Sequence, residues 1–251
     1  MRNGDHIRSG NEAMKRSFSH YLLSLLYPPI CIICREPVRL DRDYPLCAGC
    51  EASIHAYRAP LCRRCGHQLS EPSDAYGCRA CCRDTLYFDR AFSCCVFDGT
   101  LRACLHYFKY AGKLSLQGLF IKKTCSFLRD HLEPNSIDML IPVPLHWTKQ
   151  YDRGYNQTII LTRGIAQACG YPLLTDALIR TRPTDAQYAL NKTARILNVN
   201  GAFVCRRQRL ISGRRILLID DIFTTGATTS ACSRALKKAG ARHVTVCTVA
   251  R

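Results

Sequence analysis

A strand-like run that ends in two carboxylates is the feature that most constrains this chain. Residues 216–219 are four consecutive large aliphatic side chains, a pattern typical of a strand buried on both faces of a parallel sheet. Asp220 and Asp221 follow directly, and a threonine-rich loop comes next. Behind the loop, the pattern predicts a helix over 227–239 and a strand over 244–249. This order predicts half of a doubly wound α/β sheet, with its loop at the carboxyl end where such sheets bind ligands.

The chemistry of this loop indicates a sugar phosphate. A glycine lets the backbone approach an anion closely, and the amides at a helix start point toward it. Asp220 and Asp221 would repel a bare phosphate, so they suit vicinal hydroxyls or a hydrated magnesium ion. We therefore expect a ribose 5-phosphate rather than an ordinary polar turn. The residues expected around the phosphate are Thr224, Thr225, Gly226, Ala227 and Thr228.

An internal repeat of cysteines occupies the N-terminal part of the chain. Two C-x2-C pairs separated by twelve residues recur at an offset of 31 residues. A two-residue gap lets both thiolates of a pair face one ion, and two pairs complete a tetrahedron. This predicts two closed structural Zn²⁺ sites, one per repeat, that leave no position for a substrate. The predicted ligands are Cys31, Cys34, Cys47 and Cys50, followed by Cys62, Cys65, Cys78 and Cys81.

Other arrangements of these cysteines stay open at this point. Crossed pairing between the repeats, an iron site and redox pairs are alternatives, and Cys82 competes with Cys81 as a ligand. The remaining cysteines lack this spacing and stand among apolar residues, so we expect buried thiols. They are Cys94, Cys95, Cys104, Cys125, Cys169, Cys205, Cys232 and Cys247.

The charge of the chain points to anionic partners. Lys and Arg total 36 against 19 Asp and Glu, a formal net charge of +17. Such an excess attracts nucleic acid, an anionic membrane or a phosphorylated substrate. No run is long enough to span a bilayer and no signal peptide is recognisable, so we expect a cytoplasmic protein without a transmembrane segment.

Two polar stretches between the cysteine repeat and the acid pair supply further candidate contacts. Residues 149–157 read KQYDRGYNQ, in which Arg153 can bind a phosphate through two N–H groups. Asn156 can bind the same phosphate or cap the following helix. Residues 178–198 are rich in arginine with little apolar periodicity, which predicts a mobile flap. A nucleic-acid track with Tyr188 as a stacking face is the alternative.

These motifs together resemble a known family. The loop after the acid pair resembles the signature of type I phosphoribosyltransferases that binds phosphoribosyl pyrophosphate (PRPP). Residues 149–157 resemble the motif RGFNQ, with Tyr155 in place of phenylalanine, and residues 178–198 resemble R-x-R-x-T-x-x-Q followed by R-x-x-N. With the cysteine repeat, the chain from about Tyr27 onward is similar to the ComF/GntX family of natural competence and use of external DNA.

The resemblance implies a domain order. A flexible N-terminus would occupy residues 1–27, and the apolar spacing within 18–27 predicts a short amphipathic helix there. A double zinc-ribbon module would follow over 28–86, and a phosphoribosyltransferase-type domain over 87–251. That domain is expected to be the doubly wound, mainly parallel α/β sheet.

The resemblance also implies roles in a site for PRPP and Mg²⁺. Asp220, Asp221 and Arg153 would be the catalytic residues. The backbone amide of Val143 would meet the pyrophosphate, and a flap carrying Arg195 would close over it. Lys109 would lie near the ligand, with a solvated helix end as the alternative. The residues expected to contact the ligand thus include Val143, Asn156, Lys109 and Arg195.

Two functions fit these expectations. The first is a PRPP-binding protein of DNA uptake or use of external DNA, with single-stranded DNA and a DNA-uptake helicase or processing proteins as partners. The second is an active phosphoribosyltransferase with an unknown nitrogen acceptor and no DNA role. One departure weakens a purine-salvage activity: many such enzymes carry an acid three residues after the pair, where this chain has Thr224.

Overall fold

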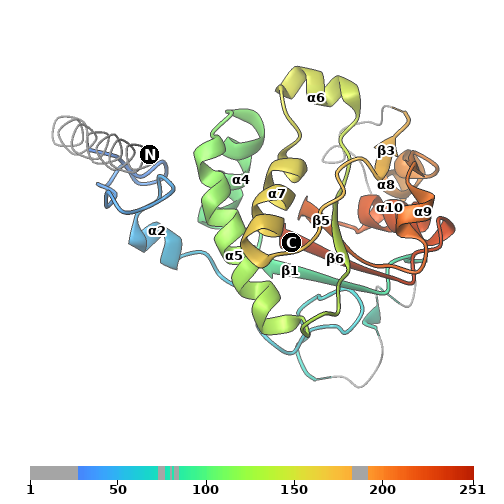
Figure 1. Cartoon of the computed structure of the whole chain (residues 1–251). Helices are drawn as coiled ribbons and strands as arrows, with labels where there is room; N and C mark the ends of the chain where they lie inside the picture. Colours follow the sequence, from blue (N-terminus) through green and yellow to red (C-terminus); the bar gives the residue numbers. More distant parts are fainter. Residues whose placement is uncertain (1–27, 73–76, 80, 82–84, 183–191) are drawn as a thin grey trace, which may run out of the picture. The chain divides into compact units, whose positions relative to one another are not determined.

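The computed structural model describes residues 28–72, 77–79, 81, 85–182 and 192–251 (Figure 1). The chain divides into two compact units, Met1–Ser53 and Ile54–Arg251. The first cysteine repeat falls in one unit and the second in the other, while the predicted domain boundaries stay a prediction. The helix predicted within 18–27 and the role of Cys82 lie outside the described residues.

A four-stranded parallel sheet forms the centre of the second unit. Its strand order is β1-β6-β5-β2, and every neighbouring pair is parallel. Residues 216–219 in β5 are almost completely buried, as expected for a strand covered on both faces. This confirms the predicted parallel α/β fold. The strands are β1 (Arg90–Cys95), β2 (Met139–Pro142), β5 (Arg215–Ile222) and β6 (His243–Ala250).

Helices cover both faces of the sheet. Helix α5 (Gln117–His131) contacts β1 and β6, α7 (Gln157–Cys169) contacts β2 and β5, and the two helices pack together. Helix α10 (Ala227–Lys238) contacts β5 and β6 and also the antiparallel pair β3 (Leu178–Arg180) and β4 (Phe203–Cys205). Figure 1 shows α5 and α7 on one side of the sheet and α10 on the other. The sheet is therefore doubly wound, as predicted.

The stretch 178–198, predicted as a mobile flap, has regular structure at both of its described ends, and residues 183–191 lie outside the described part, so the flap itself stays a prediction. Its first residues form β3, because they pair with β4, and its last residues lie in α8 (Lys192–Val199), which packs on α10. The short helices α6 (Trp147–Arg153) and α9 (Gln208–Ile211) were also not expected. The other helical elements are α2 (Ala48–Ala52), α4 (Gly99–Tyr110) and a 3₁₀ turn (Leu114–Leu116).

The cysteines outside the repeats are buried at six of the eight positions. Cys169 and Cys205 are the exceptions, and both are half-buried. Cys169 is the last residue of α7, and Cys205, which ends the short strand β4, packs against the core without being enclosed by it. Within the part of the chain that the structure describes, no helix is long and apolar enough to cross a lipid bilayer.

The two cysteine repeats fold into the same knuckle. The bridge between Ile30 and Pro37 recurs 31 residues later as the bridge between Leu61 and Gln68. The left-handed residue of the first knuckle is Arg35, with φ of 69°, and its counterpart is Gly66, with φ of 67°. An arginine is therefore accommodated in the first repeat where the second uses glycine.

The second knuckle packs directly on the parallel sheet, and this explains its glycine. The N–H of Ala91 in β1 donates to the carbonyl of Arg64 at 2.7 Å. A Cβ atom on Gly66 would lie 2.7 Å from the carbonyl oxygen of Ala91. On the same strand, the N–H of Tyr57 donates to the carbonyl of Cys94. The second repeat and the segment just before it therefore cover an edge of the sheet that would otherwise expose unpaired backbone groups.

Replacing Gly66 with alanine should destabilise the second unit. The new Cβ meets a backbone oxygen that cannot move without shifting β1, so we expect a loss of about 1–3 kcal/mol in the free energy of unfolding. Arg35→Ala is the matched control, because that position already holds an L-residue with the same φ. Thermal melts of the zinc-loaded proteins measure both changes. Equal effects of the two substitutions would contradict the packing argument.

Candidate functional site

A cavity of about 1540 Å³ lies at the carboxyl ends of β2 and β5. Parallel strands place such a cavity where the loops that follow them meet. Predicted site residues from four separate segments reach this cavity, which brings the acid pair and several cations together. Those that line it are Lys109, Val143, Arg153, Asp220, Asp221, Thr224 and Thr228.

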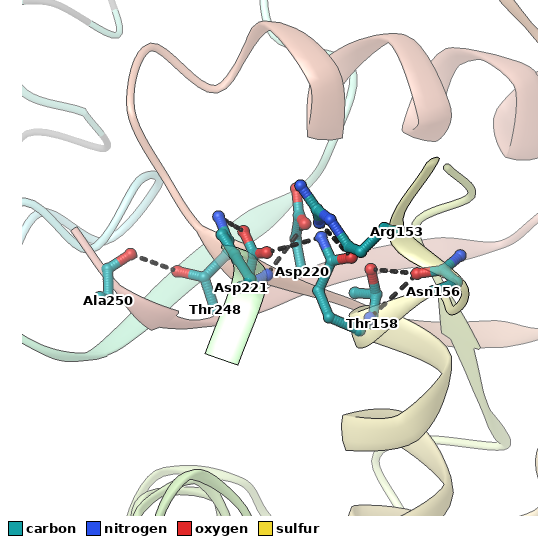
Figure 2. A network of polar contacts seen from close by, with 9 residues as sticks. Arg153, Asn156, Thr158, Asp220, Asp221, Thr248 and Ala250 are labelled. Atoms are coloured by element: carbon teal, nitrogen blue, oxygen red, sulfur yellow. Dashed lines mark hydrogen bonds and ion pairs between the residues drawn. The ribbon is translucent and has the colours of Figure 1, made fainter. Parts of the chain in front are cut away.

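Asp221 is buried and held by two side chains from different helices. Its Oδ1 atom lies 2.8 Å from Nζ of Lys109, and its Oδ2 atom accepts a hydrogen bond from Nε2 of Gln157 at 2.9 Å. Gln157 in turn accepts from Nη1 of Arg153 at 2.6 Å. Figure 2 shows Arg153, Asp220 and Asp221 as members of one network of polar contacts. Lys109 therefore lies in the site, where it compensates the charge of the pair.

Asp220 carries an unusual proton affinity. Burial and the neighbouring charge of Asp221 raise the pKa of the Asp220 carboxyl to about 7, against the lowering effect of Lys109 and Arg180. The carboxyl also accepts a hydrogen bond from the N–H of Asp221 at 2.9 Å. A carboxyl that gains its charge near neutral pH, next to a paired one, is a property common at ligand sites.

The loop of residues 224–228, called the anion loop below, is shaped by one glycine. Gly226 has φ of +77°, and a Cβ atom there would lie 2.6 Å from the ring of Phe223. Oγ1 of Thr225 accepts a hydrogen bond from the N–H of Ala227, and Oγ1 of Thr229 donates to the carbonyl of Gly226. Gly226 is therefore required both for its backbone conformation and for the ring beneath it.

The tyrosine that replaces phenylalanine in the RGYNQ stretch has a structural role. The hydroxyl of Tyr155 donates a hydrogen bond to the carbonyl of Phe108, the residue before Lys109. The guanidinium of Arg153 stacks over the ring of Tyr110 at 5.2 Å. These two contacts tie the end of α4 to the RGYNQ stretch, so that Lys109 and Arg153 face the same cavity.

The structure does not show three of the predicted ligand contacts. The N–H of Val143, expected to meet pyrophosphate, donates instead to the carbonyl of Ile219 at 2.9 Å, since β2 pairs with β5 beyond its last residue. Asn156 caps α7: its Oδ1 accepts from the N–H and the hydroxyl of Thr158, at 3.0 and 2.9 Å (Figure 2). Arg195 lies in α8, and its side chain is outside the described part of the structure. Ligand contacts by these residues stay predictions.

Two residues at the site were not assigned a role from the sequence. Gln157 joins Arg153 to Asp221, and only its position at the end of the RGYNQ stretch pointed to it. Arg180 lines the main cavity and also a smaller one of about 560 Å³ beside it. Its guanidinium lies 5.4 Å from the ring centre of Phe203, and burial lowers its pKa. Its place at the start of the R-x-R pattern was the only signal in the sequence.

The eight predicted metal ligands form two separate tetrads. Within each repeat the four sulfur atoms lie within 4.8 Å of one another, so pairing within repeats replaces the crossed alternative. In the second tetrad the Sγ atoms of Cys62 and Cys81, and those of Cys65 and Cys78, are 3.9 and 3.8 Å apart. Four sulfurs bound to one zinc ion at about 2.3 Å stand about 3.8 Å apart. Both tetrads therefore fit closed zinc sites.

Replacing Asp220 with asparagine should make the folded protein less sensitive to pH. The pKa of this carboxyl is about 7 in the folded protein against an ordinary 3.8, so the folded state binds the extra proton between these values. Stability is therefore lost as pH rises through this window, and Asn removes that loss. We expect the melting temperature of Asp220→Asn, relative to wild type, to increase from pH 5.5 to pH 8.

The exposed carboxyl of Asp176 supplies the control for this series. Its hydrogen bond from Arg207 lowers its pKa below the ordinary value, so it stays ionised throughout the same range. Asp176→Asn should therefore change the melting temperature by an amount that does not vary with pH. A constant difference for Asp220→Asn would show that Asp220 does not titrate near neutral pH.

Comparisons with known proteins agree with this architecture. A double zinc ribbon domain matches residues 22–86. The chain is 27% identical over 225 residues to Competence protein F of Haemophilus influenzae, and 26% identical over 226 residues to DNA utilization protein YhgH of Salmonella typhi. Each of these alignments covers 88% of this chain and 96% of the relative. Competence protein ComFC of Bacillus subtilis is 26% identical over 224 residues, which cover 84% of this chain and 90% of that protein.

Solved structures of similar fold include an allosteric regulatory enzyme of purine biosynthesis, with a TM-score of 0.40 and 18% identity over 58% of this chain and 30% of that longer one. A purine phosphoribosyltransferase from Pyrococcus horikoshii has a TM-score of 0.32 and 15% identity over 52% of this chain and 71% of that chain. At these TM-scores the fold assignment rests on the parallel sheet and the tetrads of this chain. The chain is thus a homologue of Competence protein F, ComFC and YhgH, with a double zinc ribbon followed by a doubly wound α/β sheet.

Proposed function

We propose that the second unit binds PRPP together with Mg²⁺ in the main cavity. The observation that carries this proposal is the opening of the acid pair and the anion loop into one cavity that also holds Lys109 and Arg153. Anions are attracted to the amino end of a helix, and the anion loop leads into α10. The 5-phosphate of the ligand would bind there, next to Thr224 and Thr228.

The acid pair would bind the ribose and its metal ion. Lys109 neutralises Asp221 in the ligand-free protein, and a divalent cation or ribose hydroxyls would take over that role. The released ammonium group of Lys109 would then join Arg153 at the pyrophosphate. Lys109 would thus bind Asp221 in the ligand-free protein and the pyrophosphate in the ligand-bound protein. Asp221 would never remain buried without a partner.

An active transferase is favoured by the size of the cavity. It continues along α4 past Lys109, where Arg102, His106 and Tyr107 line it, and so leaves room for a second molecule beside PRPP. A nitrogen atom of that acceptor would form a bond to C1 of the ribose as the bond from C1 to the pyrophosphate oxygen breaks. Lys109 and Arg153 would stabilise the charge of the departing pyrophosphate.

A role in the use of DNA is supported by the names of the relatives and by a surface next to the site. Trp147 and Tyr151 are one helical turn apart on α6 and are 71% and 85% exposed. Trp147 borders the smaller cavity, which Arg180 and Arg206 also line. Aromatic faces beside guanidinium groups bind single-stranded nucleic acid by stacking and charge. We propose that this surface binds single-stranded DNA. A DNA-uptake helicase or processing proteins as further partners stay a prediction.

Calorimetric titration with PRPP and Mg²⁺ tests the ligand site. Wild type should release or absorb heat with a single site per chain, and Asp221→Asn should bind at least about tenfold more weakly. That loss corresponds to hydrogen bonds to a charged group, worth about 1.5–3 kcal/mol. Asp41→Asn is the control, because Asp41 pairs with Arg39 in the other unit and is exposed. A wild-type protein that shows no heat with PRPP at any Mg²⁺ concentration would rule the site out.

Binding of a fluorescent oligothymidylate tests the DNA surface. Trp147→Ala and Tyr151→Ala should each weaken binding about fivefold or more, since stacking on one base is worth about 1–3 kcal/mol. Leu210→Ala, which removes an exposed aliphatic side chain, should bind as wild type does. Affinity should also fall steeply with salt. Equal binding by all four proteins would place DNA elsewhere. Absence of binding by wild type would exclude it.

A further inference from the structure

We propose that Phe223 and Arg251 are positioning residues that connect the second zinc tetrad to the anion loop, so that zinc in this tetrad strengthens ligand binding at the loop. The proposal rests on the proposed binding of PRPP. It assigns the two zinc ribbons different roles, because the first tetrad lies in the other compact unit.

The anion loop rests on the ring of Phe223. This side chain is only 3% exposed, and its N–H donates to the carbonyl of Ala250 at 2.8 Å. The ring lies directly under Gly226, close enough that a Cβ atom on Gly226 would overlap it. A change in the position of the Phe223 ring must therefore change the backbone of the loop, because packed groups shift together.

Arg251 holds this ring from the other side. Its guanidinium carbon lies 4.6 Å from the centre of the Phe223 ring, and its Nη1 donates to the carbonyl of Cys65 at 2.6 Å. The Arg251 backbone is fixed as well: its N–H donates to the carbonyl of Cys95, and its carbonyl accepts from the N–H of Phe97 and the hydroxyl of Tyr57. One guanidinium thus joins a tetrad residue to the ring beneath the anion loop.

The carbonyl that binds Arg251 belongs to a metal ligand. Cys65 closes the second knuckle, in which the N–H of Gly66 donates to the carbonyl of Cys62. The folding of a small ribbon depends on its metal, because binding free energy supplies its folding free energy. Loss of the ion should therefore release the Cys65 carbonyl, and Arg251 would lose the acceptor that orients it.

A second set of contacts also connects the second zinc ribbon to the anion loop and to α10. The segment after the tetrad places Phe88 edge-on against Phe223, with ring centres 5.9 Å apart. The N–H of Tyr87 donates to Oγ of Ser230 in the first turn of α10. The same segment is tied to the knuckle, since Nη2 of Arg64 donates to the carbonyl of Leu86 at 2.9 Å. The ribbon therefore supports both the loop and the start of the helix behind it.

Titration of the zinc-loaded, full-length protein with PRPP and Mg²⁺ is the first part of the test. Arg251→Gln should weaken binding about five- to tenfold, within the usual range of coupling between sites. Cys62→Ser, which opens the second tetrad, should do the same, whereas Cys34→Ser in the first tetrad should leave the affinity unchanged. Phe223→Leu keeps an apolar side chain and removes the ring, and it supplies a second variant if Arg251→Gln does not fold.

Zinc release gives a readout that a purely structural effect would not change. Coupling is reciprocal, so saturating PRPP with Mg²⁺ should slow transfer of one of the two zinc ions to a chromogenic chelator. In Arg251→Gln, held at the same degree of saturation, this protection should be lost. Equal protection of both ions in wild type, or unchanged protection in Arg251→Gln, would overturn the coupling.

The outcomes also separate this inference from the proposed function. Absence of PRPP binding in wild type would refute the site and the coupling together. Binding in wild type that Arg251→Gln and Cys62→Ser leave unaltered would refute the coupling alone. Weaker binding in Cys34→Ser as well as in Cys62→Ser would show a general need for zinc rather than a path through Arg251.

Discussion

The burial of two adjacent carboxylates at the end of a central strand is the constraint on which the rest of the site depends. Like charges this close cannot both be taken from water without compensation. Lys109 and Gln157 supply it for Asp221, and Asp220 keeps a pKa of about 7. Helices α4 and α7 must therefore meet at the carboxyl end of β5. A bound cation would relieve the repulsion between Asp220 and Asp221, and such electrostatic repulsion is common at ligand sites.

Metal binding is the second constraint, and it acts unequally on the two ribbons. The knuckles share one fold, yet only the second has glycine at the left-handed position, where the carbonyl of Ala91 leaves no room for a side chain. The cysteines of this tetrad belong to the same apolar core as Phe88 and Phe223. The second ribbon is therefore part of the sheet unit in physical terms, and this is why zinc bound there would also stabilise the proposed ligand site.

Local patterns in the sequence predicted the structural features that depend on residues close together in the chain. The spacing of the cysteines indicated two tetrads, although only the folded structure excluded crossed pairing between the repeats, and the aliphatic run before Asp220 was sufficient for β5 and its loop. Interactions between distant segments had no such signal. Pairing of β3 with β4, the use of the Val143 N–H by Ile219, and the contact of Arg251 with a carbonyl 186 residues away all arise only after the chain has folded.

A crystal structure of the protein grown with PRPP and Mg²⁺ is the sharpest test of the proposed ligand site. The proposed site predicts a phosphate on the anion loop, the ribose or its metal ion on Asp220 and Asp221, and Lys109 turned from Asp221 toward the pyrophosphate. An intact pair between Lys109 and Asp221, with the ligand bound elsewhere or absent at saturating concentration, would contradict it.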